Sequence, residues 1–186
     1  MAMCITALTA AAKSNVATLT LVMQSSDAGY GVCGVTSLGD AVFVVRCNSQ
    51  QKIEVYDAKT FSIQRHITVP GLGNWPNGIA ACARNKCVYI SDYDNEKVHR
   101  IKPARRIKAV QNWSVASGPQ GLSVNRDHNL VVACPEARKI QEYRKPGCLV
   151  REICLTGSIR PWQAVQLSTG DYVVWVSQFS SSGMIV

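Results

Sequence analysis

The chain has 186 residues, of which 47% are apolar and 17% are charged, and its net charge is +8. This composition excludes an intrinsically disordered chain, because so much apolar surface offsets the entropy that is lost when a chain orders. The length fits one domain, or one domain with a tail, and no apolar run reaches the roughly 18 residues of a membrane-spanning helix.

The N-terminal segment, residues 1–29, is apolar and lacks a basic start. Lys13 follows the first apolar stretch, whereas a signal peptide carries its positive charge before the apolar region. We therefore expect a cytoplasmic protein without membrane association, whose cysteines are reduced. The stretch from Val16 to Met23 would supply one outer strand to a β-sheet.

Two sequence landmarks recur about every 43 residues. The first starts at residues 32, 76, 119 and 161, and it reads Pro-x-Gly-aliphatic in its two central copies. The second starts with a lysine in each of three copies, at Lys52, Lys97 and Lys139. Two landmarks that keep the same phase indicate an internal structural repeat.

Each repeat unit contains four short stretches rich in β-branched and aromatic residues, with turn residues between them. Four short strands in a unit of about 40–45 residues are typical of a β-propeller blade. The glycines at 34, 78 and 121 fall in the innermost strands, where crowding near the axis favours a residue without a side chain. The sequence predicts an all-β propeller of about 3.5 four-stranded blades. Their expected ranges are 30–69, 70–116, 117–158 and, incompletely, 159–186.

The second unit carries the most specific pattern, in which Asp92, Asn95 and Val98 follow one another at intervals of three residues. With the Pro-x-Gly motifs, this pattern resembles the NHL-repeat family of six-bladed β-propellers, and most of all the divergent NHL-like propellers of invertebrate animals. The likeness covers about residues 30–176, although Cys134 and Ala137 replace the Asp and Asn in the third unit. We interpret Asp92 and Asn95 as residues that fasten a loop by hydrogen bonds to nearby backbone amides.

About 3.5 blades do not complete the six-bladed ring that the resemblance implies. One interpretation is an open arc, the incomplete copy of a larger ring. The alternative is a closed four-bladed ring in which Val16 to Met23 completes the last blade. An open arc leaves apolar faces uncovered on its terminal blades, so it predicts self-association through these open ends.

The eight cysteines include no pair at the spacing of a zinc knuckle, so we expect no metal site. Cys82 and Cys87 flank a predicted turn at Arg84-Asn85 and would face each other across the hairpin. A disulfide between them is geometrically feasible. The alternative is a pair of small buried thiols.

A basic segment from residue 97 to residue 108 contains six cations and no carboxylate. It is interpreted either as a phosphate-facing patch or as a solvated loop. Three tryptophans recur near the inner strands, where they would pack blade on blade or form a stacking platform for single-stranded RNA. The cations are Lys97, Arg100, Lys102, Arg105, Arg106 and Lys108, and the tryptophans are Trp75, Trp113 and Trp162.

No nucleophile elbow, zinc-protease motif or phosphate-binding loop occurs in the sequence. The inner strands begin with Cys33, Asn77, Gln120 and Gln163, and neutral amides are weak ligands for calcium or zinc. These residues would instead line a polar channel or hydrogen-bond a peptide. We therefore expect no cofactor and no enzymatic activity in this chain.

The preferred hypothesis is a non-enzymatic binding or scaffold module that recognises a protein partner through its propeller loops. The NHL resemblance implies a possible place in ubiquitin ligases of the TRIM type, whose activity would require a RING domain elsewhere in a longer product. The alternative is an RNA-binding propeller that uses the segment from Lys97 to Lys108. A degenerate lactonase-like or lyase-like propeller is a minor alternative.

Overall fold

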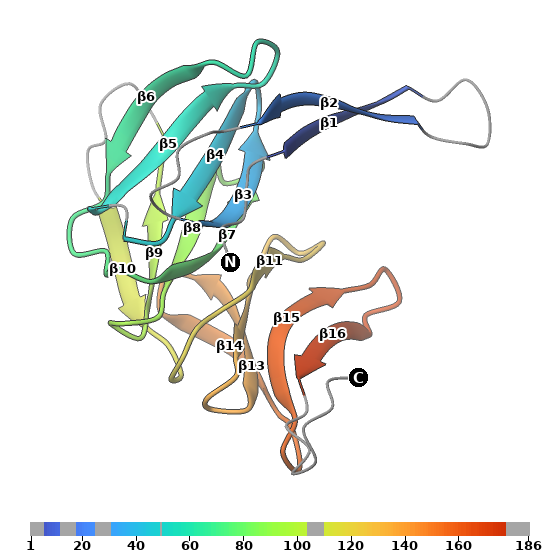
Figure 1. Cartoon of the computed structure of the whole chain (residues 1–186). Helices are drawn as coiled ribbons and strands as arrows, with labels where there is room; N and C mark the ends of the chain where they lie inside the picture. The colour runs from blue at the N-terminus through green and yellow to red at the C-terminus, as the bar shows by residue number, and fades with distance from the viewer. Residues whose placement is uncertain (1–5, 12–17, 25–30, 49, 104–109, 178–186) are drawn as a thin grey trace, which may run out of the picture.

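A computed structural model of the chain describes residues 6–11, 18–24, 31–48, 50–103 and 110–177 (Figure 1). The regular elements of these residues are sixteen β-strands. Because no helix occurs among them, the described part of the chain has no helix that could cross a membrane.

Three antiparallel four-stranded sheets follow one another along the chain, and in each sheet the strands are paired in sequence order. The first blade contains β3 (Val32–Leu38), β4 (Ala41–Arg46), β5 (Lys52–Asp57) and β6 (Ile63–Thr68). The second contains β7 (Pro76–Cys82), β8 (Cys87–Asp92), β9 (Lys97–Ile101) and β10 (Val110–Ser114). The third contains β11 (Leu122–Val124), β12 (Leu130–Cys134), β13 (Lys139–Lys145) and β14 (Cys148–Cys154).

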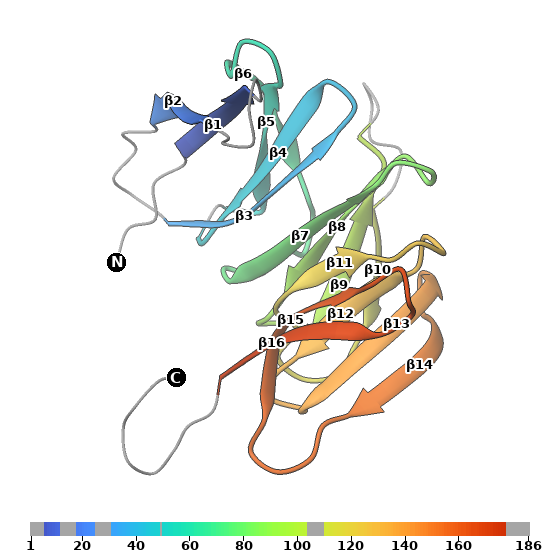
Figure 2. The same cartoon turned by 90° about the vertical axis from the view of Figure 1, so that its right-hand side faces the viewer.

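The last blade is a two-stranded sheet formed by β15 (Arg160–Gln166) and β16 (Tyr172–Ser177). The four sheets stack face to face in an open arc (Figure 2). This arrangement confirms the all-β propeller of about 3.5 blades that the repeat predicts.

The closed four-bladed alternative is wrong for the described residues. The strand β2 (Thr18–Gln24) pairs with β1 (Thr6–Ala11) in a sheet of two strands beside the first blade (Figure 1). A short apolar segment forms a hairpin readily with its sequence neighbour, because the loop to be closed is short. The predicted strand therefore exists, but it does not complete the last blade.

The apolar core lies between the blades and not inside any one of them. Between the first two blades, Phe43 and Val55 pack with Ile90 of β8 in one buried cluster. A second cluster joins the second and third blades through Trp113 and Tyr143. A strand buried on both faces needs apolar side chains at successive positions, as in the fully buried run of β12.

The outer face of the last blade is exposed. Val165, Val173 and Trp175 have exposed fractions of 46%, 56% and 68%. Val165 and Val173 are register partners, so they share the side of the β15–β16 sheet that the third blade does not cover. The arc thus presents an apolar surface at this end.

The inner strands approach one another so closely that two positions require glycine. A β-carbon on Gly78 would collide with the Gln120 carbonyl of the next blade, and one on Gly121 would collide with the Trp162 carbonyl. The Ser91 hydroxyl bridges the second and third blades at the first of these close contacts. It accepts a hydrogen bond from Gly78 N at 2.6 Å and donates one to Gln120 O at 2.7 Å.

We predict that Gly78→Ala lowers the free energy of unfolding by about 1–3 kcal/mol, the usual cost of overpacking a tight contact. Urea unfolding followed by circular dichroism measures the change. Ser114→Ala, on the exposed side of β10, is the control and should change stability by less than about 0.5 kcal/mol. Equal stability of the two variants would contradict the close approach of the blades.

Candidate functional site

The inner strands β3, β7, β11 and β15 together line a groove of about 630 Å³, which we call the axial groove. Each blade contributes the start of its innermost strand, because propeller blades converge toward the axis. The structure thereby brings together all four residues that the sequence places at these starts. They are Cys33, Asn77, Gln120 and Gln163.

The amide side chains of the groove differ in their hydrogen bonding. Gln163 donates from Nε2 to the Leu122 carbonyl at 3.0 Å, so it ties the last blade to the third. Among the described residues, the side chains of Asn77 and Gln120 make no hydrogen bond. Both are half-buried, so each offers an amide donor and acceptor to a ligand in the groove.

An aromatic pair forms one wall of the axial groove. The rings of Trp162 and Trp175 have centroids 6.3 Å apart and are tilted by 42°. Trp175 projects from β16, the last strand of the described residues, and remains largely exposed. No Asp, Glu, Lys, Arg or His is found among the described residues that line the groove, which is therefore apolar with neutral polar groups.

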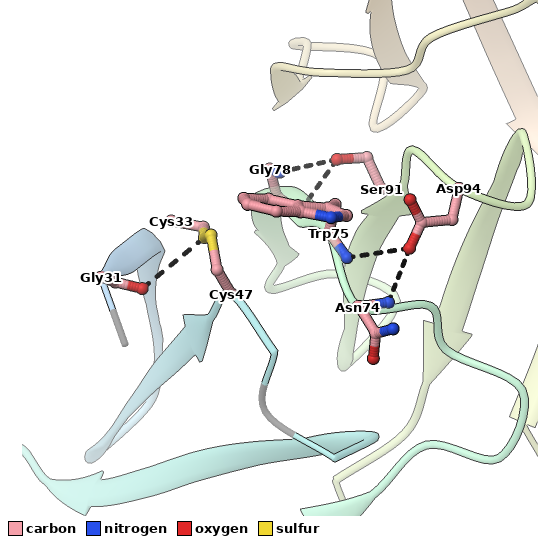
Figure 3. The surroundings of a disulfide bond; sticks show 8 residues. All are labelled: Gly31, Cys33, Cys47, Asn74, Trp75, Gly78, Ser91 and Asp94. Carbon is pink, nitrogen blue, oxygen red and sulfur yellow. Dashed lines mark hydrogen bonds between the residues drawn. A yellow bond between two sulfur atoms is a disulfide. The ribbon is translucent and has the colours of Figure 1, made fainter. Parts of the chain in front are cut away.

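A disulfide between Cys33 and Cys47 forms the opposite wall (Figure 3). Their α-carbons are 6.1 Å apart, and Cys47 N also donates to the Gly31 carbonyl at 3.1 Å. The neighbouring loop is fixed by Asp94, whose Oδ2 accepts from the amides of Asn74 at 2.7 Å and Trp75 at 3.1 Å. The covalent bridge holds the start of β3 to the end of β4.

Of the two interpretations of Cys82 and Cys87, the disulfide is wrong and the pair of small buried thiols is confirmed. The two residues face each other across the β7–β8 hairpin, as the turn predicts, but both are free, buried thiols. The expectation of reduced cysteines also fails, at Cys33 and Cys47. A turn at Gly39-Asp40 sets these two nearly opposite each other in the β3–β4 hairpin, a signal that the sequence contains.

The described cations of the basic segment do not share one face. Lys97 and Arg100 lie on β9 at positions of opposite parity, so their side chains leave opposite faces of the sheet. Arg100 donates from Nη1 to Gln111 Oε1 at 2.6 Å, and Lys102 is exposed beyond the end of the strand. Arg105, Arg106 and Lys108 lie outside the described residues.

The three predicted tryptophans have three different environments. Trp113 is buried between the second and third blades, where its ring contacts Tyr89 and Tyr143. Trp162 lines the axial groove, whereas Trp75 is 56% exposed beside the disulfide. The interpretation that these tryptophans pack blade on blade therefore holds for Trp113.

A buried Asp–His pair was not identified from the sequence. Asp92 Oδ2 lies 2.8 Å from His99 Nε2, and both side chains are almost fully buried. The carboxylate also accepts from Gly73 N at 3.1 Å and from Asn95 Nδ2 at 2.9 Å. This network confirms that Asp92 and Asn95 fasten a loop, and its burial keeps the pair from any substrate.

Burial acts to raise the pKa of Asp92, but the hydrogen bonds from His99, Asn95 and Gly73 N outweigh it and lower the pKa below its usual value. The ionised carboxylate is therefore the form that the fold stabilises. The described residues contain no group of three or more His, Cys, Asp or Glu side chains arranged to hold a metal ion.

Comparisons with known proteins support the fold alone. No family model matches the chain, and no curated protein matches it in sequence. Hydrazine synthase of Kuenenia stuttgartiensis superposes with a TM-score of 0.67 at 18% identity. Virginiamycin B lyase from Staphylococcus aureus, crystallised with quinupristin, gives 0.67 at 17% identity, and the WD40 propeller domain of Doa1 gives 0.64 at 12% identity.

The chain spans only part of these structures. The aligned regions cover 81%, 94% and 83% of the chain, but 43%, 59% and 51% of the synthase, the lyase and the Doa1 domain. Two of these three neighbours are enzymes and the third is a WD40 domain, although all three share the propeller fold. A shared propeller fold therefore does not select a function, which has to be argued from the site.

Proposed function

We propose that the chain is a non-enzymatic binding module that holds an extended peptide segment of a partner protein in its axial groove. The observation that carries this proposal is the pair of half-buried amides, Asn77 and Gln120, whose side chains have no hydrogen-bond partner among the described residues and which line the groove with the tryptophan pair and the disulfide. A peptide backbone has one donor and one acceptor per residue, and a side-chain amide matches both. The exposed indole of Trp175 would cover an apolar side chain of the peptide.

The chemistry of the groove favours binding over catalysis. A hydrolytic or eliminating enzyme uses a general acid or base, a nucleophile or a metal in the groove, and the described lining offers neutral amides, glycines and apolar side chains. Within this proposal the chain is a propeller of the NHL type, an assignment that the repeat pattern of the sequence supports. A protein partner then fits the scaffold role that such propellers have.

Selection of random peptides from a phage library on the immobilised protein tests the proposal. We expect selected peptides whose affinity falls about tenfold or more when Asn77 and Gln120 are both replaced by alanine, because each lost hydrogen bond costs about 0.5–1.5 kcal/mol. Binding is measured by fluorescence anisotropy with labelled synthetic peptides. Thermal unfolding of the double variant establishes that it is folded.

Asn112→Ala is the matched control, since this amide is exposed on β10, away from the groove. It should leave the affinity within about twofold. Failure to select any peptide, or equal loss of affinity in the Asn112 variant, would contradict a peptide site in the axial groove.

A further inference from the structure

A second and larger hollow separates the first two blades at the ends remote from the axial groove. Its volume is about 1340 Å³, and we call it the inter-blade cleft. Its floor is apolar and includes Leu38, Ala41, Phe43 and Val55. None of these residues lines the axial groove, so the two sites are separate.

Four cations from both blades surround this apolar floor. Arg65 belongs to β6 of the first blade, and the second blade supplies Arg84 and Lys86 from the β7–β8 turn and Lys102 from beyond β9. Arg84, Lys86 and Lys102 are exposed. They are separated by up to 37 positions in the sequence, from 65 to 102, and only the stacking of the blades gathers them.

Strand register explains why Arg65 points into the cleft. Val55 is the register partner of Phe43 on β4 and of Arg65 on β6, so the three side chains leave the same face of the first blade. Arg65 then donates from Nη2 to the Pro103 carbonyl at 3.0 Å, across the cleft. Its guanidinium is thereby held close to Lys102.

The described lining of the cleft carries a net positive charge, and the exposed Asp40 lies in sequence between its lining residues Gly39 and Ala41. No carboxylate is among its described lining residues. The nearby Asp57 accepts from Gln64 Nε2 at 3.1 Å, and its other oxygen is taken by the backbone amides of Lys59 and Thr60, both at 2.8 Å. Cations gathered around a low-dielectric floor raise the local concentration of anions.

We propose that the inter-blade cleft binds an acidic peptide segment that also carries apolar side chains. The cations would meet Asp or Glu side chains, while the floor of Leu38 and Ala41 would take the apolar residues. Single-stranded RNA fits less well, because its bases stack on exposed aromatic rings, and Phe43, the aromatic residue of the described lining, is only 2% exposed.

Fluorescence anisotropy with a fluorescein-labelled peptide in which Glu alternates with Leu tests this site at low ionic strength. We expect saturable binding whose affinity falls about tenfold or more in the double variant Lys86→Glu, Lys102→Glu. The double variant Lys52→Glu, Lys59→Glu changes the net charge equally at exposed positions outside the cleft, and it should retain the affinity within about twofold.

Two altered peptides separate the contribution of the acidic side chains from that of the apolar contacts with the floor of the cleft, without changing the protein. A peptide with Gln in place of Glu should bind weakly, and one with Ser in place of Leu should lose affinity as well. The double variant Asn77→Ala, Gln120→Ala should not change the affinity for the Glu–Leu peptide. A failure of the inter-blade cleft proposal is therefore distinguishable from a failure of the axial groove proposal.

Equal effects of the two charge-reversing double variants would overturn the proposal, since they would indicate attraction to net charge alone. If the Ser-containing peptide bound with the same affinity as the Leu-containing peptide, the proposed contact between apolar peptide side chains and the floor of the cleft would be wrong. Tighter, cleft-dependent binding of an oligouridine would replace the acidic peptide with RNA as the occupant.

Discussion

Replacement of Trp113 by alanine is expected to lower the free energy of unfolding by about 3–5 kcal/mol. The indole is 9% exposed, and it lies in a cluster shared by the second and third blades. Its centroid is 6.2 Å from that of Tyr89, in an edge-to-face arrangement, and 5.8 Å from that of Tyr143. Its removal leaves a cavity at the interface that joins the two blades.

Urea unfolding followed by circular dichroism measures this loss. The matched control is Trp75→Ala, which removes the same side chain from an exposed position and should cost less than about 1 kcal/mol. Trp113→Phe should retain part of the stability, because the phenyl ring fills much of the cavity. A similar loss in the Trp75 and Trp113 variants would contradict the burial of Trp113 between the blades.

Replacement of Asp92 by alanine is expected to cost about 3–5 kcal/mol at neutral pH, the range for removing one partner of a buried pair. The buried His99 side chain, the Asn95 amide and the Gly73 N–H would all lose their acceptor. Asp94→Ala is the control two residues further along the same loop, where the carboxylate is exposed. It should cost no more than about half as much, because water replaces its hydrogen bonds.

The pH dependence of stability should reveal the same network. Because the pKa of Asp92 is lower in the folded state than its unfolded value of about 3.9, its contribution is present above that value and is lost as the pH falls through the folded pKa. Asp92→Asn should therefore be less stable than wild type at pH 7. The difference in the free energy of unfolding between the two proteins should become smaller below about pH 4.

Urea unfolding at a series of pH values between about 2 and 7 measures this difference in the free energy of unfolding. Glu142, whose pKa is also lowered, is present in both proteins, so the difference between them isolates Asp92. Parallel stability curves over the whole range would show that Asp92 is not held ionised by its partners.

The sequence predicted the architecture because each blade repeats its own local signals. Four strand-like stretches and their turns recur in phase, and Gly78 and Gly121 mark the crowded inner strands. The residues that begin these strands were also predicted to line a channel, because the Pro-x-Gly landmark sets their register. One axial groove then follows from stacking identical units around an axis.

The remaining site features depend on contacts between blades, which a repeat pattern does not encode. Trp175 lies outside both landmarks, and the inter-blade cleft joins Arg65 to Lys102 across a blade boundary. The basic segment looked continuous in sequence, but strand alternation sends Lys97 and Arg100 to opposite faces. Lys97 and Arg100 therefore do not contribute to one common patch.

Hydrogen exchange, measured by mass spectrometry with and without a peptide selected on the protein, tests most directly whether the axial groove is the binding surface. We predict slower exchange in 76–82, 122–124 and 160–166, the inner strands of the second to fourth blades, and no change in the β7–β8 turn at 83–86. Protection confined to the outer strands β6, β10 and β14 would contradict the account.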